Sequence, residues 1–286
     1  MTTTPLTPGF TSDLLAGVPL GPQTLVALDI DGTILGMDGT ISARVQRAIA
    51  RVVEAGTHLV LATGRSVVAV TPIIARLGLR QGYAVCSNGA VTISFDERGY
   101  QMVDVVTFDP GPAMRALREH APEVIYAVED LGRGFKVTRP FPDGELGGDQ
   151  QVASFEELAA APATRVVLRA PELGADAFHE LVASSGLHGV NYAVGWTAWL
   201  DLSPDGVSKA SALEEVRQRL EVQHTVAVGD GRNDIEMFGW ADVAVAMDDA
   251  DADTKAAADA YTGPVTLDGL VPVLNALSSG AAQPAG

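Results

Sequence analysis

Cysteine is nearly absent from the sequence, since Cys86 is the only one in 286 residues. A lone cysteine excludes an intramolecular disulfide, so we interpret Cys86 as a buried apolar side chain and expect a reducing, cytoplasmic location. Basic residues are also scarce, with 19 lysines and arginines against 36 aspartates and glutamates and a net charge of −17. This acidity argues against nucleic acid or an anionic membrane surface as a partner, whereas it suits the binding of a divalent cation.

The chain also lacks long apolar runs. No uninterrupted apolar stretch reaches the roughly 18 residues of a membrane span, so no membrane association is expected. Residues 1–23 lack the basic start and the apolar stretch of a secretory signal, and their Thr, Pro and Gly content indicates a flexible N-terminal arm. The histidines lack zinc-ligand spacing, and the absence of Gly-x-Gly-x-x-Gly after the first strand disfavours a nucleotide-binding Rossmann module.

What the sequence does contain is an apolar run, Leu25–Leu28, that stops at two aspartates and a turn in Asp29-Ile30-Asp31-Gly32-Thr33. A short apolar run bounded by a turn is typical of a central parallel strand that is covered on both faces. Asp29 and Asp31 lie two residues apart, so strand geometry projects both side chains to the same side. For these residues alone, a strand that ends in an ordinary Asp-Gly turn is an equally good interpretation.

Strand and helix patterns alternate from this run onward. Helical periodicity at 42–56 and 67–77 separates apolar strands at 58–63 and 83–88. The two strands end in Thr63-Gly64 and in Asn88. This order predicts an α/β fold with a Rossmann-like, doubly wound parallel sheet as its core. Because the carboxyl ends of such strands converge at one rim, the polar residues that end them should lie close together where these folds bind ligands.

The pattern changes after residue 88. Shorter strand-like and helical pieces follow, interrupted by a Pro- and Gly-rich loop at 139–149, and a helix is expected at 176–184. This change predicts an inserted α+β domain rather than a continuation of the same sheet. We therefore divide the chain into the arm at 1–23, a discontinuous core at 24–88 and 197–286, and an inserted domain at 89–196.

The core pattern resumes near residue 207 with a helix that carries Lys209 in its first turn, where a cation is disfavoured unless it meets an anion. Lys209 is either a solvated surface side chain or the partner of a phosphate or carboxylate. An apolar strand then ends in Gly229-Asp230-Gly231-Arg232-Asn233-Asp234. Taken singly, Asp230 is as readily a turn residue and Asp234 as readily a helix cap. Their occurrence together with the earlier aspartates favours a functional site.

These segments resemble the four ordered motifs of the haloacid dehalogenase superfamily. The matching residues are Asp29-Ile30-Asp31-Gly32-Thr33, Thr63-Gly64-Arg65, Lys209 and Gly229-Asp230-Gly231-Arg232-Asn233-Asp234. Ser87-Asn88-Gly89-Ala90 and Gly206-Val207-Ser208-Lys209 further resemble its Cof-type sugar-phosphatase branch, with Ala210 in place of the usual Gly. The resemblance spans residues 25–277 and implies that the insertion is that branch's large α/β cap, which selects substrates. Asp31 favours phosphatases and phosphomutases, because dehalogenating and phosphonate-cleaving relatives lack it.

The resemblance implies a Mg²⁺-dependent phosphatase that acts through an aspartyl-phosphate. Asp29 is the expected nucleophile, Asp31 the general acid and base in acidic surroundings, and Lys209 the cation that faces the phosphoryl group. The expected Mg²⁺ ligands are Asp29, Asp230, the backbone carbonyl of Asp31, and Asp234 either directly or in the outer shell. The residues expected to hold or orient the phosphoryl group are Thr63, Gly64, Asn88 and Asn233.

The expected partner is a small phosphorylated metabolite, with sugar phosphates or related cofactors favoured, and the expected state is a monomer or homodimer. A phosphomutase and a metal-dependent binding or regulatory protein without turnover stay open as alternatives. Arg133, Lys136 and Arg139 offer positive charge to an anionic substrate, although a solvated charged face is the commoner role for such residues. Trp196 and Trp199 are interpreted as packing residues rather than as a sugar platform.

Overall fold

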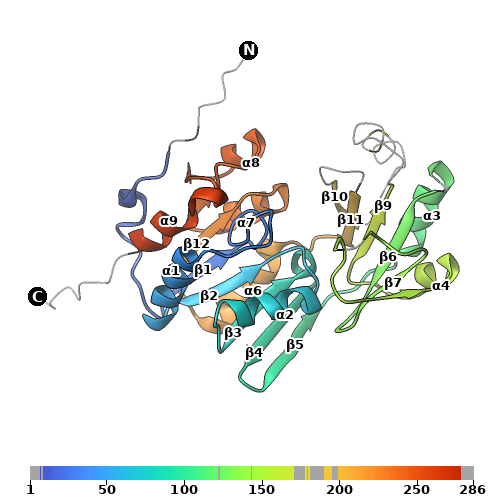
Figure 1. Ribbon diagram of the computed structural model, residues 1–286, viewed down its shortest axis with the longest axis horizontal. Helices are drawn as coiled ribbons and strands as arrows, with labels where there is room; N and C mark the ends of the chain where they lie inside the picture. Colours follow the sequence, from blue (N-terminus) through green and yellow to red (C-terminus); the bar gives the residue numbers. More distant parts are fainter. Residues whose placement is uncertain are drawn as a thin grey trace, which may run out of the picture.

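The computed structural model describes residues 7, 9–121, 123–142, 144–170, 178, 180, 190–194 and 199–277. These residues form two β-sheets, one of eight strands and one of six. Figure 1 shows the eight-stranded sheet and its helices on the left and the six-stranded sheet on the right. The helix expected at 176–184 lies almost wholly outside the described residues and stays a prediction. No helix in the described part of the chain is long and apolar enough to cross a membrane.

The eight-stranded sheet has a parallel centre and an antiparallel edge. Its order is β14–β13–β12–β1–β2–β3–β4–β5, with parallel pairs from β14 to β3 and antiparallel pairs from β3 to β5. The strands are β1 (Thr24–Leu28), β2 (His58–Ala62), β3 (Gly82–Cys86), β4 (Val91–Asp96), β5 (Gly99–Val105), β12 (His224–Gly229), β13 (Val243–Ala246) and β14 (Ala260–Tyr261). β1 is buried along its whole length, and the expected Rossmann-like α/β core is confirmed.

Helices cover both faces of this sheet. One face packs against α1 (Ala43–Glu54), α2 (Val67–Arg76) and α9 (Leu270–Ala276), and the other packs against α6 (Lys209–Leu220) and α7 (Ile235–Trp240). Successive residues of β1 alternate between these two cores, with Val26 in the first and Ala27 in the second. The shorter elements are α8 (Ala252–Ala256) and the 3₁₀ turns η1 (Ser12–Leu15), η2 (Ser87–Gly89), η3 (Arg232–Asp234) and η4 (Val265–Leu267).

The six-stranded sheet has the order β10–β11–β9–β6–β7–β8 and is antiparallel except between β7 and β8. Its strands are β6 (Ile125–Asp130), β7 (Gly134–Val137), β8 (Asp149–Val152), β9 (Val166–Arg169), β10 (Val190–Val194) and β11 (Trp199–Pro204). One face packs against α3 (Gly111–His120) and α4 (Phe155–Ala160). The other face carries a smaller apolar cluster that includes Phe135, Phe141 and Leu146.

The boundary between the two sheets differs from the expected division of the chain. β4 and β5 were expected in the insertion that starts at residue 89, but they extend the eight-stranded sheet as a hairpin beside β3. β11 was expected in the core that resumes at residue 197, but it pairs with β9 and β10. The boundary was predicted from the point where strand–helix alternation ends. This point marks the change from parallel to antiparallel pairing, and the sheet continues beyond it.

Two further segments also differ from expectation. The described part of the expected N-terminal arm is packed on the core, because Leu15 is fully buried and the Phe10 N–H donates to the Tyr261 carbonyl (2.7 Å). After the predicted loop at 139–149, β8 and α4 form without having been expected. β8 has no alternation of apolar and polar residues, because its pattern is Asp-Gln-Gln-Val at the edge of the sheet.

Candidate active site

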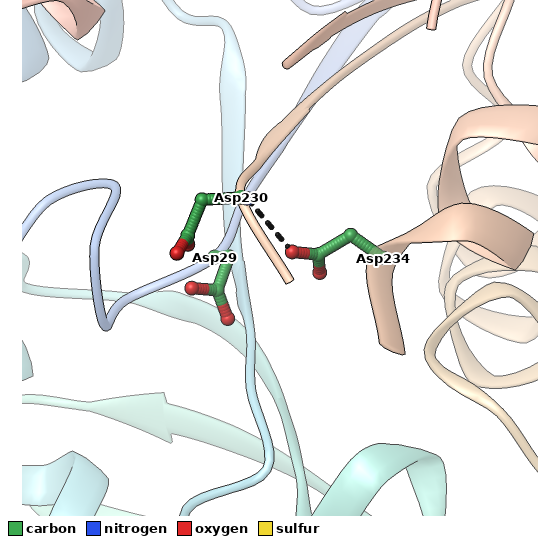
Figure 2. Close-up of side chains that lie close together, drawn as sticks. All are labelled: Asp29, Asp230 and Asp234. Carbon is green, nitrogen blue, oxygen red and sulfur yellow. Dashed lines mark hydrogen bonds between the residues drawn. The ribbon is translucent and has the colours of Figure 1, made fainter. Parts of the chain in front are cut away.

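The neighbouring parallel strands β1 and β12 deliver carboxylates to the same edge of the eight-stranded sheet. Leu28 pairs with Val228, and the backbone N–H of Asp29 donates to the Val228 carbonyl (2.9 Å). Asp29 therefore lies beside Asp230, which follows β12 directly. Asp234, at the end of η3, completes a cluster in which one carboxylate oxygen from each of the three residues lies within 4.8 Å of the other two (Figure 2). These three side chains were all expected to share a metal ion.

Lys209 is fully buried beside this cluster. Its ammonium donates to Asp29 Oδ1 and to Asp234 Oδ1, both at 2.6 Å. Lys209 is therefore the partner of carboxylates and not a solvated surface side chain. Burial opposes the charged ammonium, but the carboxylates of Asp234 and Asp29 outweigh it and raise the pKa of Lys209 above its usual value. The lysine is held in its charged form.

Asp234 shapes the loop after β12 as well as binding Lys209. Its second oxygen, Oδ2, accepts hydrogen bonds from the backbone N–H groups of Asp230 (3.0 Å) and Gly231 (2.9 Å). The side chain does not cap α7, although it does cap the preceding turn η3. A fully buried carboxylate with three donors is well satisfied, so Asp234 fixes the position of Asp230.

The cluster holds three carboxylates against a single ammonium. Burial raises the pKa of Asp230 to about 7, and the charge of Asp234 adds to this rise. Burial also raises the pKa of Asp29 well above its usual value, with Lys209 opposing the shift and the two aspartates reinforcing it. Such mutual repulsion of oxygen donors in a buried site fits a small, hard divalent cation, which would stabilise the ionised forms.

Glycine is required where the first motif turns beneath Asp230. Gly32 has a φ of +81°, and a Cβ built on it would lie 2.2 Å from Asp230 Oδ2. No side chain is accommodated at that distance without moving the carboxylate. Thr33 approaches from the same turn, and its hydroxyl donates to Asp230 Oδ1 (3.1 Å). The turn after β1 therefore sets the position of a carboxylate on the neighbouring strand.

The side chain of Asp31 does not join the cluster. It is about half exposed and forms a two-point ion pair with Arg65, in which Nη2 donates to Oδ1 (2.5 Å) and Nε to Oδ2 (2.7 Å). Acidic surroundings were expected for Asp31, and the structure instead places a guanidinium on its carboxylate. The sequence alone did not identify this partner, because Arg65 follows a different strand and is paired only through the tertiary fold.

The residues expected to hold the phosphoryl group lie together at the ends of β2, β3 and β12. The Asn88 N–H donates to the Thr63 carbonyl (3.0 Å), and a Cβ on Gly64 would lie 3.1 Å from Asn88 Oδ1. Asn233 was expected to orient Lys209 or the phosphate, and its role toward the phosphate stays a prediction. In the structure its Nδ2 donates to Asn88 Oδ1 (2.9 Å). The amide pair therefore joins the loops after β3 and β12.

These groups open into a cavity of about 400 Å³ between the two sheets. Its eight-stranded wall includes Asp29, Asp31, Thr63, Gly64, Arg65, Ser66, Asp230 and Asn233. Its opposite wall includes Phe135, residues 144–147 and Arg165. The predicted site residues therefore share one cavity, except for Asn88 and for the fully buried Lys209 and Asp234, which do not line it.

The opposite wall was not identified from the sequence. The basic residues considered there, Arg133, Lys136 and Arg139, do not line the cavity, and Lys136 instead pairs with Glu157 at the surface (2.8 Å). Arg165 lines the cavity and was missed, because a lone arginine before a short strand carries no local signal. Trp196 lies outside the described residues. Trp199 packs edge-on against Phe141, with ring centres 6.1 Å apart, which confirms its packing role.

The fold and this constellation define an α/β enzyme with an acidic site at the carboxyl edge of its parallel strands and a second sheet opposite. The family model described as haloacid dehalogenase-like hydrolase matches residues 26–274. The chain therefore belongs to the haloacid dehalogenase-like hydrolases, as the motifs predicted.

Curated relatives and solved structures agree with this assignment. The chain is 30% identical over 272 residues to the pyridoxal phosphate phosphatase YbhA of Escherichia coli, covering 86% of this chain and 95% of that protein. It is 27% identical over 268 residues to the putative phosphatase YkrA of Bacillus subtilis, covering 86% and 94% respectively. Its fold matches that of the phosphatase BT1666 from Bacteroides thetaiotaomicron with a TM-score of 0.73 at 24% identity, covering 89% and 94%. These similarities place the chain among the phosphatases of the family.

Proposed function

We propose that the protein is a Mg²⁺-dependent phosphatase of small phosphorylated metabolites that works through an aspartyl-phosphate on Asp29. The observation that carries this proposal is the position of Asp29. Its carboxylate is 5% exposed, lies 2.6 Å from the Lys209 ammonium, belongs to a cluster of three carboxylates, and lines the cavity. A nucleophile needs this combination of access, fixed orientation and neighbouring positive charge.

The divalent cation would be held by Asp29 and Asp230, with the backbone carbonyl of Asp31 as a further ligand. Asp234 has both oxygens in hydrogen bonds, to Lys209 and to two backbone N–H groups, which favours an outer-shell role for it. When bound, Mg²⁺ would neutralise charge on the phosphoryl oxygens and lower their repulsion of the Asp29 carboxylate. The cluster supplies the oxygen donors that this ion prefers.

In the first step, a carboxylate oxygen of Asp29 attacks the phosphorus, the bond to the leaving oxygen breaks, and Asp31 gives that oxygen a proton. In the second, water attacks the same phosphorus, Asp31 takes a proton from it, and the Asp29 carboxylate is released. Lys209 offsets the negative charge that develops around Asp29 in both steps. Thr63 and the Gly64 N–H, which line the cavity, hold the phosphoryl oxygens.

Asp31 must leave its ion pair before it donates a proton. Both of its oxygens are engaged by Arg65 in the structure, at 2.5 and 2.7 Å. We infer that a bound ester competes for the Arg65 guanidinium through its phosphoryl oxygens, and that the freed Asp31 carboxylate then takes up from solvent the proton that it gives to the leaving oxygen.

The six-stranded sheet would act as the cap. It corresponds to the insertion expected at 89–196, without β4 and β5 and with β11 added. It supplies the cavity wall that faces the nucleophile, so it would contact the leaving group and exclude water. Sugar phosphates remain candidate substrates, and pyridoxal 5′-phosphate joins them, because the relative at 30% identity is named for that activity.

The test is phosphate release from 4-nitrophenyl phosphate and a panel of sugar, nucleotide and pyridoxal phosphates, with Mg²⁺ or with EDTA. We expect turnover that depends on Mg²⁺ and that falls by more than about 1,000-fold in Asp29→Asn. The matched control is Asp13→Asn, the same chemical change at an exposed position, which should retain wild-type turnover. Circular dichroism and thermal unfolding check that both variants fold.

Three outcomes would contradict the proposal. Turnover by a rigorously purified Asp29→Asn enzyme would remove Asp29 as the nucleophile. Release that needs a bisphosphate activator would indicate a phosphomutase. No release from any ester by a folded protein that binds Mg²⁺ would indicate a binding or regulatory protein.

A further inference from the structure

Arg165 is a buried arginine on the cavity wall that faces the nucleophile. It directly precedes β9, its side chain is 10% exposed, and it lines the same cavity as Asp29 and Asp31. An arginine stays charged at neutral pH even when it is buried, so its donors need acceptors in place of the water they have lost. A donor of Arg165 that has no acceptor in the protein is therefore a candidate to bind an anionic ligand.

Within the described part of the chain, the Nε group is the one donor of Arg165 that has an acceptor. Arg165 Nε donates to Asp201 Oδ1 (2.5 Å), and the indole N–H of Trp199 donates to the other oxygen of that carboxylate (2.8 Å). The guanidinium carbon lies 5.9 Å from the centre of the Phe135 ring. These contacts hold the guanidinium in one orientation. Among the described residues, neither of its Nη groups has a hydrogen-bond partner.

Of the other charged groups that line the cavity, Arg65, Asp31 and Glu145 have charged partners, whereas Asp29 and Asp230 belong to the carboxylate cluster beside Lys209. Arg65 uses Nε and Nη2 on Asp31. Glu145 accepts from Arg169 Nε with both of its oxygens, at 3.3 and 3.2 Å. Within the described part of the chain, the two Nη groups of Arg165 therefore have no acceptor on this wall. We call these two groups the Nη edge of Arg165.

We propose, on the basis of the function proposed above, that the Nη edge of Arg165 binds a second anionic group of the substrate. The preferred esters are then small phosphomonoesters whose leaving group carries a carboxylate or a second phosphate. A guanidinium held in a fixed plane matches the two oxygens of such a group with two parallel hydrogen bonds. The phosphoryl group meets Asp29 at one wall of the cavity while the second anion meets Arg165 at the other.

The experiment compares two pairs of esters that differ mainly in the second anion. One pair is 3-phosphoglycerate and glycerol 3-phosphate, in which a carboxylate replaces a hydroxymethyl group. The other is fructose 1,6-bisphosphate and fructose 6-phosphate. For each pair, the ratio of kcat/KM between the anionic and the neutral leaving group is measured in wild type and in Arg165→Met and Arg165→Lys, with Mg²⁺. The matched control is Arg118→Met, because Arg118 lies on α3, which covers the face of the six-stranded sheet opposite to the cavity.

We expect wild type to prefer at least one of the anionic leaving groups. Arg165→Met should lower that preference by about 10- to 100-fold, mainly through KM, because two charge-assisted hydrogen bonds are lost. Arg165→Lys keeps the charge and a partner for Asp201, so it should lose part of the preference, whereas Arg118→Met should keep all of it. The pair that responds shows whether the second anion is a carboxylate or a phosphate.

Several results would overturn the inference. If wild type releases phosphate without preferring either anionic ester, Arg165 selects no anion. If Arg165→Met lowers turnover of both members of each pair equally, the Arg165–Asp201 pair is only structural. If Arg165→Met fails to fold, an unchanged preference in Arg165→Lys leads to the same conclusion. Absence of release from every ester, including 4-nitrophenyl phosphate, is a different result and removes the proposed function itself.

Discussion

At the scale of single residues, the site depends on one buried cation among three buried or half-buried carboxylates. Lys209 alone cannot balance Asp29, Asp230 and Asp234, which is why burial and mutual repulsion raise the pKa values of Asp29 and Asp230. Lys209 nevertheless holds two of them in place through hydrogen bonds of 2.6 Å. These hydrogen bonds orient the Asp29 and Asp234 carboxylates, and the cluster sets three carboxylates against one ammonium.

Gly32 provides a residue-scale prediction. Gly32→Ala should lower kcat/KM by about 100-fold or more, because the new Cβ displaces the Asp230 carboxylate, which lies 2.2 Å from its position. Mg²⁺ affinity, measured by calorimetry, should fall with it. The control is Gly78→Ala, which has a similar φ of +69° but no atom within 4 Å of its Cβ. It isolates the cost of the backbone conformation, about 1 kcal/mol of stability. Equal activity in the two variants would show that the close approach is unimportant.

At the scale of elements, α1 and α2 begin in different ways although a serine precedes each of them. Ser42 accepts a hydrogen bond from the Val45 N–H (3.1 Å), which satisfies one free donor at the start of α1. Ser66 precedes α2 without such a bond, and its buried hydroxyl has no partner among the described residues. The same residue type therefore stabilises one helix start and not the other.

This difference predicts opposite results for the same substitution. Ser42→Ala should lower the free energy of unfolding by about 1 kcal/mol, because the cap hydrogen bond is lost. Ser66→Ala should leave it unchanged or raise it slightly, because a buried hydroxyl without a partner is removed. Urea unfolding of the two variants beside wild type makes the measurement. A loss of equal size in both would mean that Ser66 finds a partner in solution.

At the scale of the whole molecule, the two sheets are joined by a buried carboxylate beside the site. Glu129 in β6 accepts with Oε2 from the Ser87 hydroxyl (2.7 Å) and from the Thr164 hydroxyl (2.9 Å). Ser87 follows β3 in the eight-stranded sheet, next to Asn88, whereas Thr164 precedes β9 in the same sheet as Glu129. The first bond therefore crosses between the sheets, and the second lies within one of them.

We expect Ser87→Ala to loosen the contact between the sheets. Amide hydrogen exchange at η2 and at the end of β6 should rise about tenfold, because a hydrogen bond to a buried carboxylate is lost. Thr164→Ala removes the other bond to the same oxygen, so its faster exchange should be confined to β6 and β9. Faster exchange at η2 in Thr164→Ala, or none in Ser87→Ala, would show that Glu129 does not join the sheets.

The sequence by itself determined the elements of the core and the edge at which its polar residues gather. Apolar runs, helical periodicity and turn residues are local signals, so they predicted β1, β2, α1 and α2 and placed Asp29 and Asp230 at the ends of two buried strands. Parallel geometry then brings these ends together without further information. The haloacid dehalogenase-like family followed from the same motifs.

Only the tertiary structure decided which distant side chains become partners. The pairing of Asp31 with Arg65, the addition of β4 and β5 to the first sheet, and the arrival of Arg165 at the cavity all depend on contacts between segments far apart in the chain. A charged side chain can pair with any opposite charge, and an edge strand can pair with many other strands. Sequence patterns therefore do not show which partner is used. The fold selects one partner by bringing it within hydrogen-bond distance, which is why the catalytic edge was predicted and the opposite wall was not.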